Sequence, residues 1–160
     1  MPNHVRNDLT IKGEPHILRD IVEFMRGETP FDFNKLIQCP PILQEMHTGS
    51  TEIDGKQFNY WRVVDGKEVG LTTKEAKDLL AKYGATDWYD WCCENWGTKW
   101  NAYSVKKPKL TGKSLRFSFD TAWASPTPIL QALANKFNVP IHIAISGEVD
   151  EEESYTIHPE

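Results

Sequence analysis

The sequence has few cysteines and none of the spacings that make cysteine chemistry recognisable. Its 160 residues include Cys39, Cys92 and Cys93, an odd number that gives no disulfide framework and no two-residue gap typical of redox or zinc pairs. The N-terminus shows no cationic segment followed by an apolar run, and no apolar stretch approaches the roughly 20 residues that span a bilayer. We therefore expect reduced thiols and a soluble, cytoplasmic protein without a membrane partner.

Motifs that would indicate an enzyme or a metal centre are also missing. The five histidines are dispersed, and the sequence contains no glycine-rich phosphate loop and no nucleophile elbow. One carboxylate set, Asp87, Asp90 and Glu94, has the spacing of a single helix face and could form an acid/base pair. A charge–dipole contact for Asp87 and a solvated face for the other two explain the same pattern more simply. We predict a protein that is not an enzyme and that binds no cofactor or metal.

The sequence also has fewer positively than negatively charged residues. The chain has 18 Lys and Arg against 23 Asp and Glu, a formal charge of −5, which argues against a duplex-binding surface. Much of the negative excess lies in one run near the C-terminus. That run is either a solvated acidic loop or a patch that meets a basic partner or mimics a phosphate backbone. Its candidate contact residues are Asp150, Glu151, Glu152 and Glu153.

The residues that are present predict a packed α+β domain. Hydrophobic residues make up 39% of the chain, and their spacing alternates between the period of strands and that of helices. Period-two patterns end at Gly13 and recur over 101–105, 115–120 and 139–146, with a short edge strand possible over 155–157. Helical patterns follow Pro15 and Ser125-Pro126, where we expect the serine to be the N-cap. In 115–119 the apolar residues share one face, which we expect the helices to cover, leaving no aromatics on the open face of the kind that RNA-recognition domains use.

The order of these elements is β-α-β-β-α-β, which predicts a ferredoxin-like antiparallel sheet in a single domain over 1–160. A large insertion, about 28–99, separates the first helix from the second strand, and 147–160 forms an acidic C-terminal segment. We expect the insertion to be loop-rich up to Gly70, with one short strand over 58–64. Two helices then follow, the first with a Thr72–Glu75 capping box and a buried stripe, the second capped by Thr86 and stopped by Gly97. The predicted stripe consists of Ala76, Leu79, Leu80 and Tyr83.

Three stretches are unusual enough to carry a family resemblance. They are Asn7-Asp8-Leu9-Thr10-Ile11-Lys12-Gly13, Glu94-Asn95-Trp96-Gly97-Thr98-Lys99-Trp100-Asn101 and Phe119-Asp120-Thr121-Ala122-Trp123-Ala124-Ser125-Pro126. With Phe31-Asp32-Phe33-Asn34-Lys35-Leu36-Ile37 they resemble the YubB-like group of small proteins carried by phages and conjugative plasmids. The resemblance implies a ferredoxin-like domain, a mobile-element origin and a bacterial host cytoplasm. It brings no activity and no catalytic residues.

The strongest candidate for function is the set of tryptophans Trp88, Trp91, Trp96, Trp100 and Trp123. One interpretation places them in the core, with Lys99 over an aromatic ring as a cation–π contact. The other makes them a stacking platform for single-stranded nucleic acid or an anchor for a partner protein. The candidate binding residues outside the acidic run are Trp96, Lys99, Trp100, Trp123, Lys106 and Lys107.

Two functional hypotheses follow. The leading one is an accessory protein that binds a host or phage macromolecule, with a protein partner favoured over nucleic acid because of the net charge. The alternative is a single-stranded nucleic-acid binder that uses tryptophans and lysines around residues 96–109. An enzyme is a third, weaker possibility, since a fold does not determine a function. The sequence does not indicate the oligomeric state.

Overall fold

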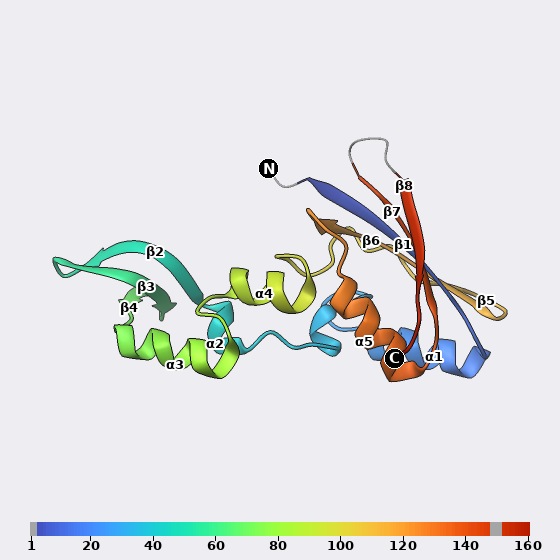
Figure 1. The fold of residues 1–160 in the computed structure, drawn as a ribbon, viewed down its shortest axis with the longest axis horizontal. Coiled ribbons are helices and arrows are strands. Elements are labelled where there is room, and N and C mark those ends of the chain that lie inside the picture. Colours follow the sequence, from blue (N-terminus) through green and yellow to red (C-terminus); the bar gives the residue numbers. More distant parts are fainter. Residues whose placement is uncertain (1–2, 148–151) are drawn as a thin grey trace. The chain divides into compact units, whose positions relative to one another are not determined.

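The computed structural model describes residues 3–147 and 152–160. The chain forms two compact units, one containing residues up to Gln38 and from Asn95 onward, the other Cys39–Glu94. We name them the five-stranded unit and the three-stranded unit after their sheets (Figure 1). No helix among the described residues combines the length and apolar composition needed to cross a membrane.

The five-stranded unit has the predicted ferredoxin-like architecture. Its sheet has the order β5-β6-β1-β7-β8, and every neighbouring pair is antiparallel. Without β8, the chain order β1-α1-β5-β6-α5-β7 is the predicted β-α-β-β-α-β. The elements are β1 (His4–Lys12), α1 (Pro15–Met25), the 3-10 helix η1 (Phe33–Lys35), β5 (Lys109–Thr111), β6 (Ser114–Ala122), α5 (Thr127–Phe137), β7 (Ile141–Ser146) and β8 (Glu152–Ile157).

The core of this unit lies between one face of the sheet and the two helices. Strand β1 alternates buried and accessible residues along its whole length, as its period-two sequence predicts. Alternating apolar side chains of β6 and β7 lie on the same face, which confirms the predicted helix-covered face. Leu115, Phe117, Phe119, Ile141 and Ile143 are at most 2% exposed, and Ile145 is half-buried. The buried faces of the helices are Leu18, Ile21 and Met25 in α1 and Ile129, Leu130, Leu133 and Ala134 in α5.

Two predicted details of this unit are wrong. The second strand is β5 at Lys109–Thr111, whereas 101–105 is a loop with a single bridge between Tyr103 and Asp120. Ser104 has a positive φ of 48°, which an extended strand does not permit. Helix α5 begins at Thr127 with Pro126 as its N-cap, so Ser125 is not the cap residue. Helix α1, the predicted strand at 139–146 and the edge strand agree with the prediction, although β8 begins earlier, at Glu152.

The three-stranded unit corrects the prediction of a loop-rich segment. Its sheet has the order β2-β3-β4, and both pairs are antiparallel. Asp54-Gly55 and Asp65-Gly66 connect the strands, and all four residues have positive φ. This is the conformation of two-residue hairpin turns, whose twist matches that of the strands. The elements are α2 (Pro41–Gln44), β2 (Met46–Ile53), β3 (Lys56–Val64), β4 (Lys67–Gly70), α3 (Thr73–Tyr83) and α4 (Trp88–Trp96). The last two residues of α4, Asn95 and Trp96, belong to the five-stranded unit.

The helices of this unit follow the prediction in part. The Thr72–Glu75 capping box is present, and Gly97 has the positive φ, 79°, of a residue that follows a helix. Leu80, predicted to be buried, is 53% exposed. The side chain that caps α4 belongs to Asp87, which accepts a hydrogen bond from the Asp90 amide at 2.8 Å, so Thr86 is not the cap.

Candidate functional site

The tryptophan motif begins in the core of the five-stranded unit. Trp96 is 4% exposed, its indole Nε1 donates a hydrogen bond to the Ile37 carbonyl at 2.8 Å, and its ring meets Phe33 edge-on. Gly97 then turns the chain, and a Cβ at this position would lie 3.0 Å from Pro128. Trp96 therefore anchors the motif and is not part of an exposed surface.

The polar residues of the motifs hold the end of the sheet together. The Asn7 side chain, which is fully buried, donates to the Thr121 hydroxyl, and that hydroxyl donates to the Ala124 carbonyl. Thr98 donates in the same way to the Ala122 carbonyl at 2.7 Å. These hydrogen bonds satisfy backbone groups at a place where the β6 ladder has ended. Three separate sequence motifs thus meet at one end of the sheet.

A second polar network fixes the loop that follows the motif. Burial alone would raise the pKa of the Asp32 carboxyl, but hydrogen bonds from the Asn101 side chain and from the Glu28 and Asn34 amides outweigh it, and the pKa lies below its ordinary value. Asn101 also accepts a hydrogen bond from the Phe33 amide. The Asp32 carboxylate therefore positions the backbone and is not available as a proton donor at neutral pH.

Exposed aromatic side chains gather beside this framework. Trp100 is 38% exposed and Trp123 59% exposed. The ring of Tyr103 contacts both Trp100 and His4 edge-on, with centroid distances of 6.2 Å and 5.5 Å. Trp123 lies at the same end of the sheet, because its amide donates to the Asn3 carbonyl next to His4. We call these four residues, His4, Trp100, Tyr103 and Trp123, the aromatic cluster.

Trp123 is held in an uncommon backbone conformation. Its φ is +72°, and the Ala124 amide donates to the Ala122 carbonyl across it at 2.9 Å, so Trp123 is the central residue of a three-residue turn. Such a conformation is costly for a bulky side chain. Here the turn directs the Trp123 side chain to the surface. Because the ring is mostly exposed, its burial offsets little of the cost of this backbone conformation.

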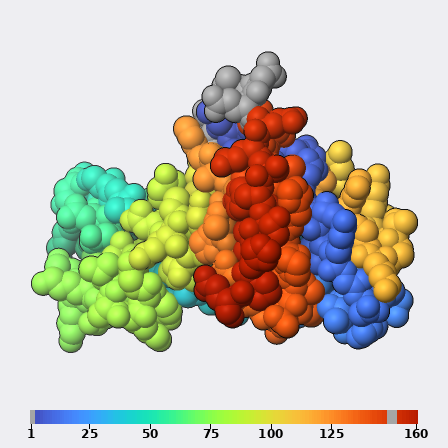
Figure 2. Space-filling view, turned by 45° about the vertical axis from the view of Figure 1, so that its right-hand side comes forward, coloured from blue at the N-terminus to red at the C-terminus, as the bar shows by residue number. Residues whose placement is uncertain are grey.

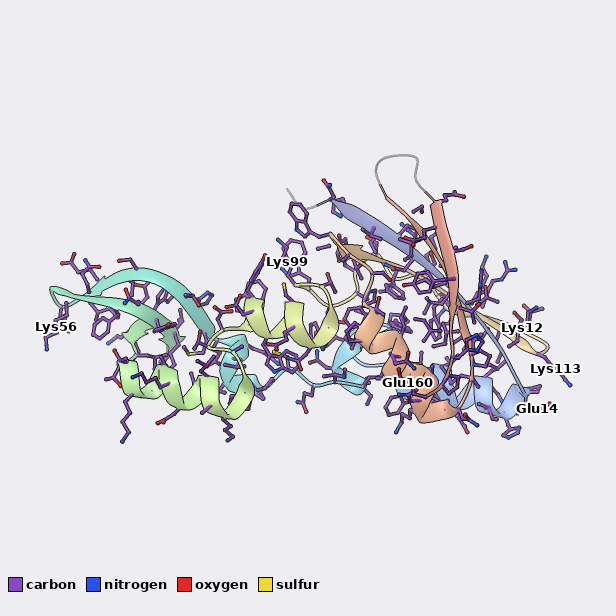
Figure 3. All side chains as sticks on the ribbon, in the orientation of Figure 1. Lys12, Glu14, Lys56, Lys99, Lys113 and Glu160 are labelled. Atoms are coloured by element: carbon purple, nitrogen blue, oxygen red, sulfur yellow. The ribbon has the colours of Figure 1, made fainter. Side chains whose placement is uncertain are left out.

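Lys99 lies over the ring of Trp100, the contact predicted for it with an aromatic side chain. Its ammonium is 4.2 Å from the centroid of the Trp100 ring, a cation–π contact (Lys99 is labelled in Figure 3). From Asn95 to Phe119 the chain contains no Asp or Glu and six cations: Lys99, Lys106, Lys107, Lys109, Lys113 and Arg116. We call residues 95–119 the basic segment. Within it, Lys113 pairs weakly with Glu14 at 3.6 Å.

The other cations of the basic segment surround a groove on the open face of the sheet. This groove, of about 260 Å³, is lined by Lys106, Lys107, Lys109 and Arg116, with the side chains of Thr10, Ser118 and Asp8 beside them. The four cations form no ion pair with any described residue, whereas the neighbouring Arg6 is neutralised by Asp120 at 2.7 Å. The groove offers several cationic and hydroxyl donors and one carboxylate, a set that suits a phosphate.

The aromatic cluster and the groove lie along one line. Tyr103 and Asp120 exchange backbone hydrogen bonds, the Lys106 amide donates to the Ser118 carbonyl, and Lys109 pairs with Arg116. The basic segment therefore follows β6 antiparallel from Asp120 to Arg116, which is about 13 Å at about 3.3 Å per residue. One strand-like path connects the exposed ring of Trp100 and the half-buried ring of Tyr103 with cations that have no ion pair among the described residues.

The two described acidic candidates, Glu152 and Glu153, lie at the opposite edge of the same sheet. Asp150 and Glu151 are outside the described residues, while Glu152 and Glu153 are exposed on β8, which lies on the surface in Figure 2. Four strand spacings of about 4.8 Å separate β5 from β8, about 19 Å in all. This exceeds the Debye length of about 8 Å at physiological salt, so the acidic edge weakly affects a ligand on the basic segment.

The remaining candidates have structural roles. A hydrogen bond with Cys39, and then burial, raise the pKa of the Cys92 thiol far above its ordinary value, so it is not a thiolate nucleophile at neutral pH. Asp87 is buried, caps α4 and accepts a hydrogen bond from Thr48. Burial and the charges of Asp87 and Glu94 raise the pKa of Asp90. Among the described residues, no three His, Cys, Asp or Glu side chains gather in a way that could hold a metal ion.

The open face of the sheet is polar, as the sequence predicts. Arg116 and His142 are exposed there, and Ser118 and Asp120 are half-buried. Strands β6 and β7 contribute no aromatic side chain to this face, so the arrangement differs from that of RNA-recognition domains. Among the described residues of this unit, the two exposed tryptophans, Trp100 and Trp123, lie at the end of the sheet.

Of the candidate binding residues outside the acidic run, Trp100 and Trp123 are exposed and Lys99 contacts Trp100, whereas Trp96 is buried. Lys106 and Lys107 line the groove, and sequence patterns miss three neighbours of these residues. His4, Tyr103 and Arg116 join the site only because β1, the 101–109 loop and β6 are neighbours. The absence of any acidic residue in 95–119 is the available signal for Arg116. No local signal in the sequence points to His4.

A comparison with protein families agrees with this fold. Residues 95–148, which include β5, β6, α5 and β7, match the family described as a ferredoxin-like domain in Api92-like protein. The matched range is about a third of the chain. The comparisons with curated proteins and with solved structures found no match. The YubB-like resemblance and the mobile-element origin stay predictions.

Proposed function

We propose that this protein is a non-enzymatic binder of single-stranded nucleic acid, held along the basic segment. The observation that carries the proposal is the path of this segment, which joins the exposed Trp100 and the half-buried Tyr103 to the cations of the groove along one side of β6. Binders of single strands combine a basic groove for the phosphates with aromatic rings on which bases stack. The length of about 13 Å is that of about four nucleotides stacked as in a duplex strand, at about 3.4 Å each.

The net charge of the whole sequence favours a protein partner. The distribution of charge favours nucleic acid instead. The basic segment contains no Asp or Glu, and the acidic β8 lies at the opposite edge of the sheet. Binding of a protein through Asp150–Glu153 remains the second hypothesis, supported by the exposure of Glu152 and Glu153. The resemblance to phage and plasmid proteins supports a mobile-element origin and a location in the bacterial cytoplasm as parts of the same proposal.

Anisotropy of a fluorescein-labelled oligo(dT) at low salt tests the proposal. We expect saturable binding that Trp123→Ala weakens about 5- to 150-fold, the equivalent of about 1–3 kcal/mol for one stacked base. Tyr89→Ala is the matched control, since Tyr89 is an exposed aromatic residue of the three-stranded unit. No binding at low salt, or equal losses in the two variants, would contradict the proposal.

Salt dependence provides a separate test of the lysines. Each phosphate contact to a single strand contributes about 0.7 to the slope of log K against log salt. The double substitution Lys106→Ala and Lys107→Ala should therefore reduce the slope by about 1.4. Lys74→Ala with Lys77→Ala on α3 removes the same charge and should leave the slope unchanged. If both pairs change it equally, net charge governs binding and the groove does not.

A further inference from the structure

The two edge strands of the five-stranded sheet are complementary in charge. At one edge, β5 carries Lys109, and at the other, β8 carries Glu152 and Glu153, all of them exposed. Charged residues on edge strands prevent two like edges from pairing. They do not prevent an acidic edge from pairing with a basic one. This difference leaves one favourable combination, β5 of one molecule with β8 of another.

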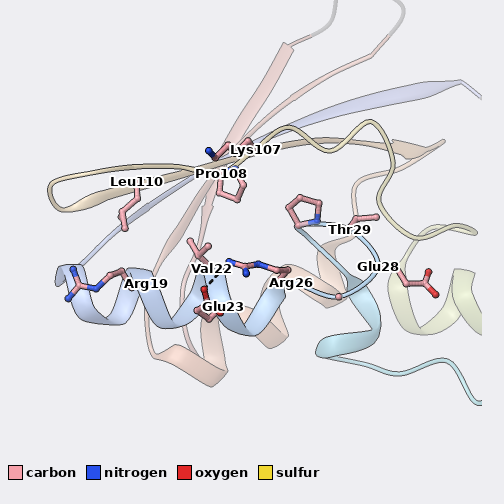
Figure 4. Close-up of a pocket in the computed structure, with 11 residues that line it drawn as sticks. Arg19, Val22, Glu23, Arg26, Glu28, Thr29, Lys107, Pro108 and Leu110 are labelled. Atoms are coloured by element: carbon pink, nitrogen blue, oxygen red, sulfur yellow. Dashed lines mark hydrogen bonds and ion pairs between the residues drawn. The ribbon is translucent and has the colours of Figure 1, made fainter.

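The free edge of β5 also lies over an open cavity. A volume of about 540 Å³ separates β5 from α1, and its apolar lining consists of Val22, Pro30, Pro108 and Leu110 (Figure 4). Leu110 pairs with the buried Leu115 and so lies on the helix-covered face, yet it is 38% exposed. An additional strand beside β5 would place its side chains in this space.

The two faces of β8 match the two faces of the β5 edge. Glu153 and Tyr155 pair with residues of β7 on the helix-covered face, whereas Glu152 lies on the open face. Arg19 and Arg26 of α1 line the cavity on the helix-covered side, and Lys109 lies on the open side. Arg26 is paired with Glu23 at 2.8 Å, but Arg19 and Lys109 form no ion pair with a described residue. On each face, a carboxylate of one edge corresponds to a cation of the other.

We propose that β8 of a second copy adds to the β5 edge and fills the cavity below it with Tyr155 and Glu153. Because the two surfaces are different, the contact is head-to-tail and leaves a free β5 and a free β8 at the ends of each assembly. The strand contact is short, so the association is weak and dependent on salt. The inference does not rest on nucleic-acid binding.

Sedimentation velocity of nuclease-treated protein tests the inference from about 10 μM to about 1 mM, a range suited to weak interfaces. We expect the average mass to rise with concentration at low salt and to return to the monomer at high salt. The charge reversals Arg19→Glu with Lys109→Glu, and separately Glu152→Lys with Glu153→Lys, should each abolish association. Lys74→Glu with Lys77→Glu on α3 is the control for the first pair, since it makes the same change in charge.

A mixture of the two reversed variants gives the decisive result. Each variant alone has two edges of the same sign, whereas the mixture offers opposite edges again and should restore association. A monomer over the whole range, or a mixture that does not associate, would overturn the inference. Association that none of the reversals alters would assign the contact to another surface and also overturn it. Circular dichroism of each variant checks that it is folded.

Discussion

The two units keep their apolar residues from water to very different extents. In the five-stranded unit, β6 alternates between buried and accessible positions and ends with two consecutive buried residues. In the three-stranded unit, Met46 is the one strand residue described as buried, and Val63, Val64 and Val69 are exposed. The first sheet is stabilised by burial on one face. The second depends much more on its turns, caps and backbone hydrogen bonds.

The largest expected effect tests burial in the five-stranded unit. Phe119 is fully buried and stacks on Phe31 with a centroid distance of 4.6 Å. Phe119→Ala removes this contact and leaves a cavity, so we expect a loss of about 3–5 kcal/mol. Val63→Ala in the exposed sheet should cost less than about 1 kcal/mol. Hydrogen exchange of the β1 and β3 amides measures each unit separately, and similar losses would remove the distinction.

The second effect concerns the buried carboxylate of the five-stranded unit. Asp32 is 4% exposed and accepts hydrogen bonds from the Asn34 amide at 3.0 Å and from Asn101 at 2.8 Å. Asp32→Asn weakens these charge-assisted bonds and turns an NH₂ group toward donors, which should cost about 1.5–3 kcal/mol at pH 7. Denaturant unfolding followed by hydrogen exchange of α1 measures the loss.

The contribution of Asp32 to the free energy of unfolding depends on pH with a definite sign. The folded-state pKa of Asp32 lies below the unfolded value of about 3.9, so its contribution is complete above that value and is lost as the pH falls through the folded pKa. The stability of Asp32→Asn should therefore approach that of the parent protein below about pH 4. Asp20→Asn, at an exposed position of α1, should keep the parent's pH profile. Parallel profiles for the parent and Asp32→Asn would refute this role.

The third effect tests the hairpin turns of the three-stranded unit. Gly55 has a φ of +76°, and a Cβ at this position would meet no other atom within 4 Å. Gly55→Ala therefore meets only the backbone cost, about 1–2 kcal/mol. Gly55→Asn should cost less, because Asn tolerates this region. Hydrogen exchange at β2 and β3 measures both. Equal costs for Ala and Asn would mean that the turn conformation does not limit stability.

The same comparison explains which parts of the fold the sequence predicts. The alternation of Leu115, Phe117 and Phe119 is strong because one face of β6 is buried, and the ferredoxin-like order follows from such signals. Strands β2 and β4 lack this alternation, since neither face of their sheet is deeply buried. The Asp-Gly pairs at 54–55 and 65–66 directly indicate hairpin turns. A prediction from the spacing of hydrophobic residues alone misses them. The candidate site is only partly predictable, because contacts such as His4 with Tyr103 depend on strand order.

The smallest expected effect is that of substituting Leu80. An unexpected result there would reverse the comparison of burial in the two units. Helical spacing predicts that Leu80 packs inside, but it is 53% exposed on α3, whereas Ala76 of the same helix is buried. Leu80→Ala should change the free energy of unfolding by less than about 0.5 kcal/mol, because Ala is a slightly better helix former and little apolar area is lost. Ala76→Leu, by contrast, inserts volume into a packed site and should cost about 1–3 kcal/mol. A loss of several kcal/mol on Leu80→Ala would mean that this helix face is covered in solution. The three-stranded unit would then depend on burial as the five-stranded unit does, through a contact that its own residues do not supply.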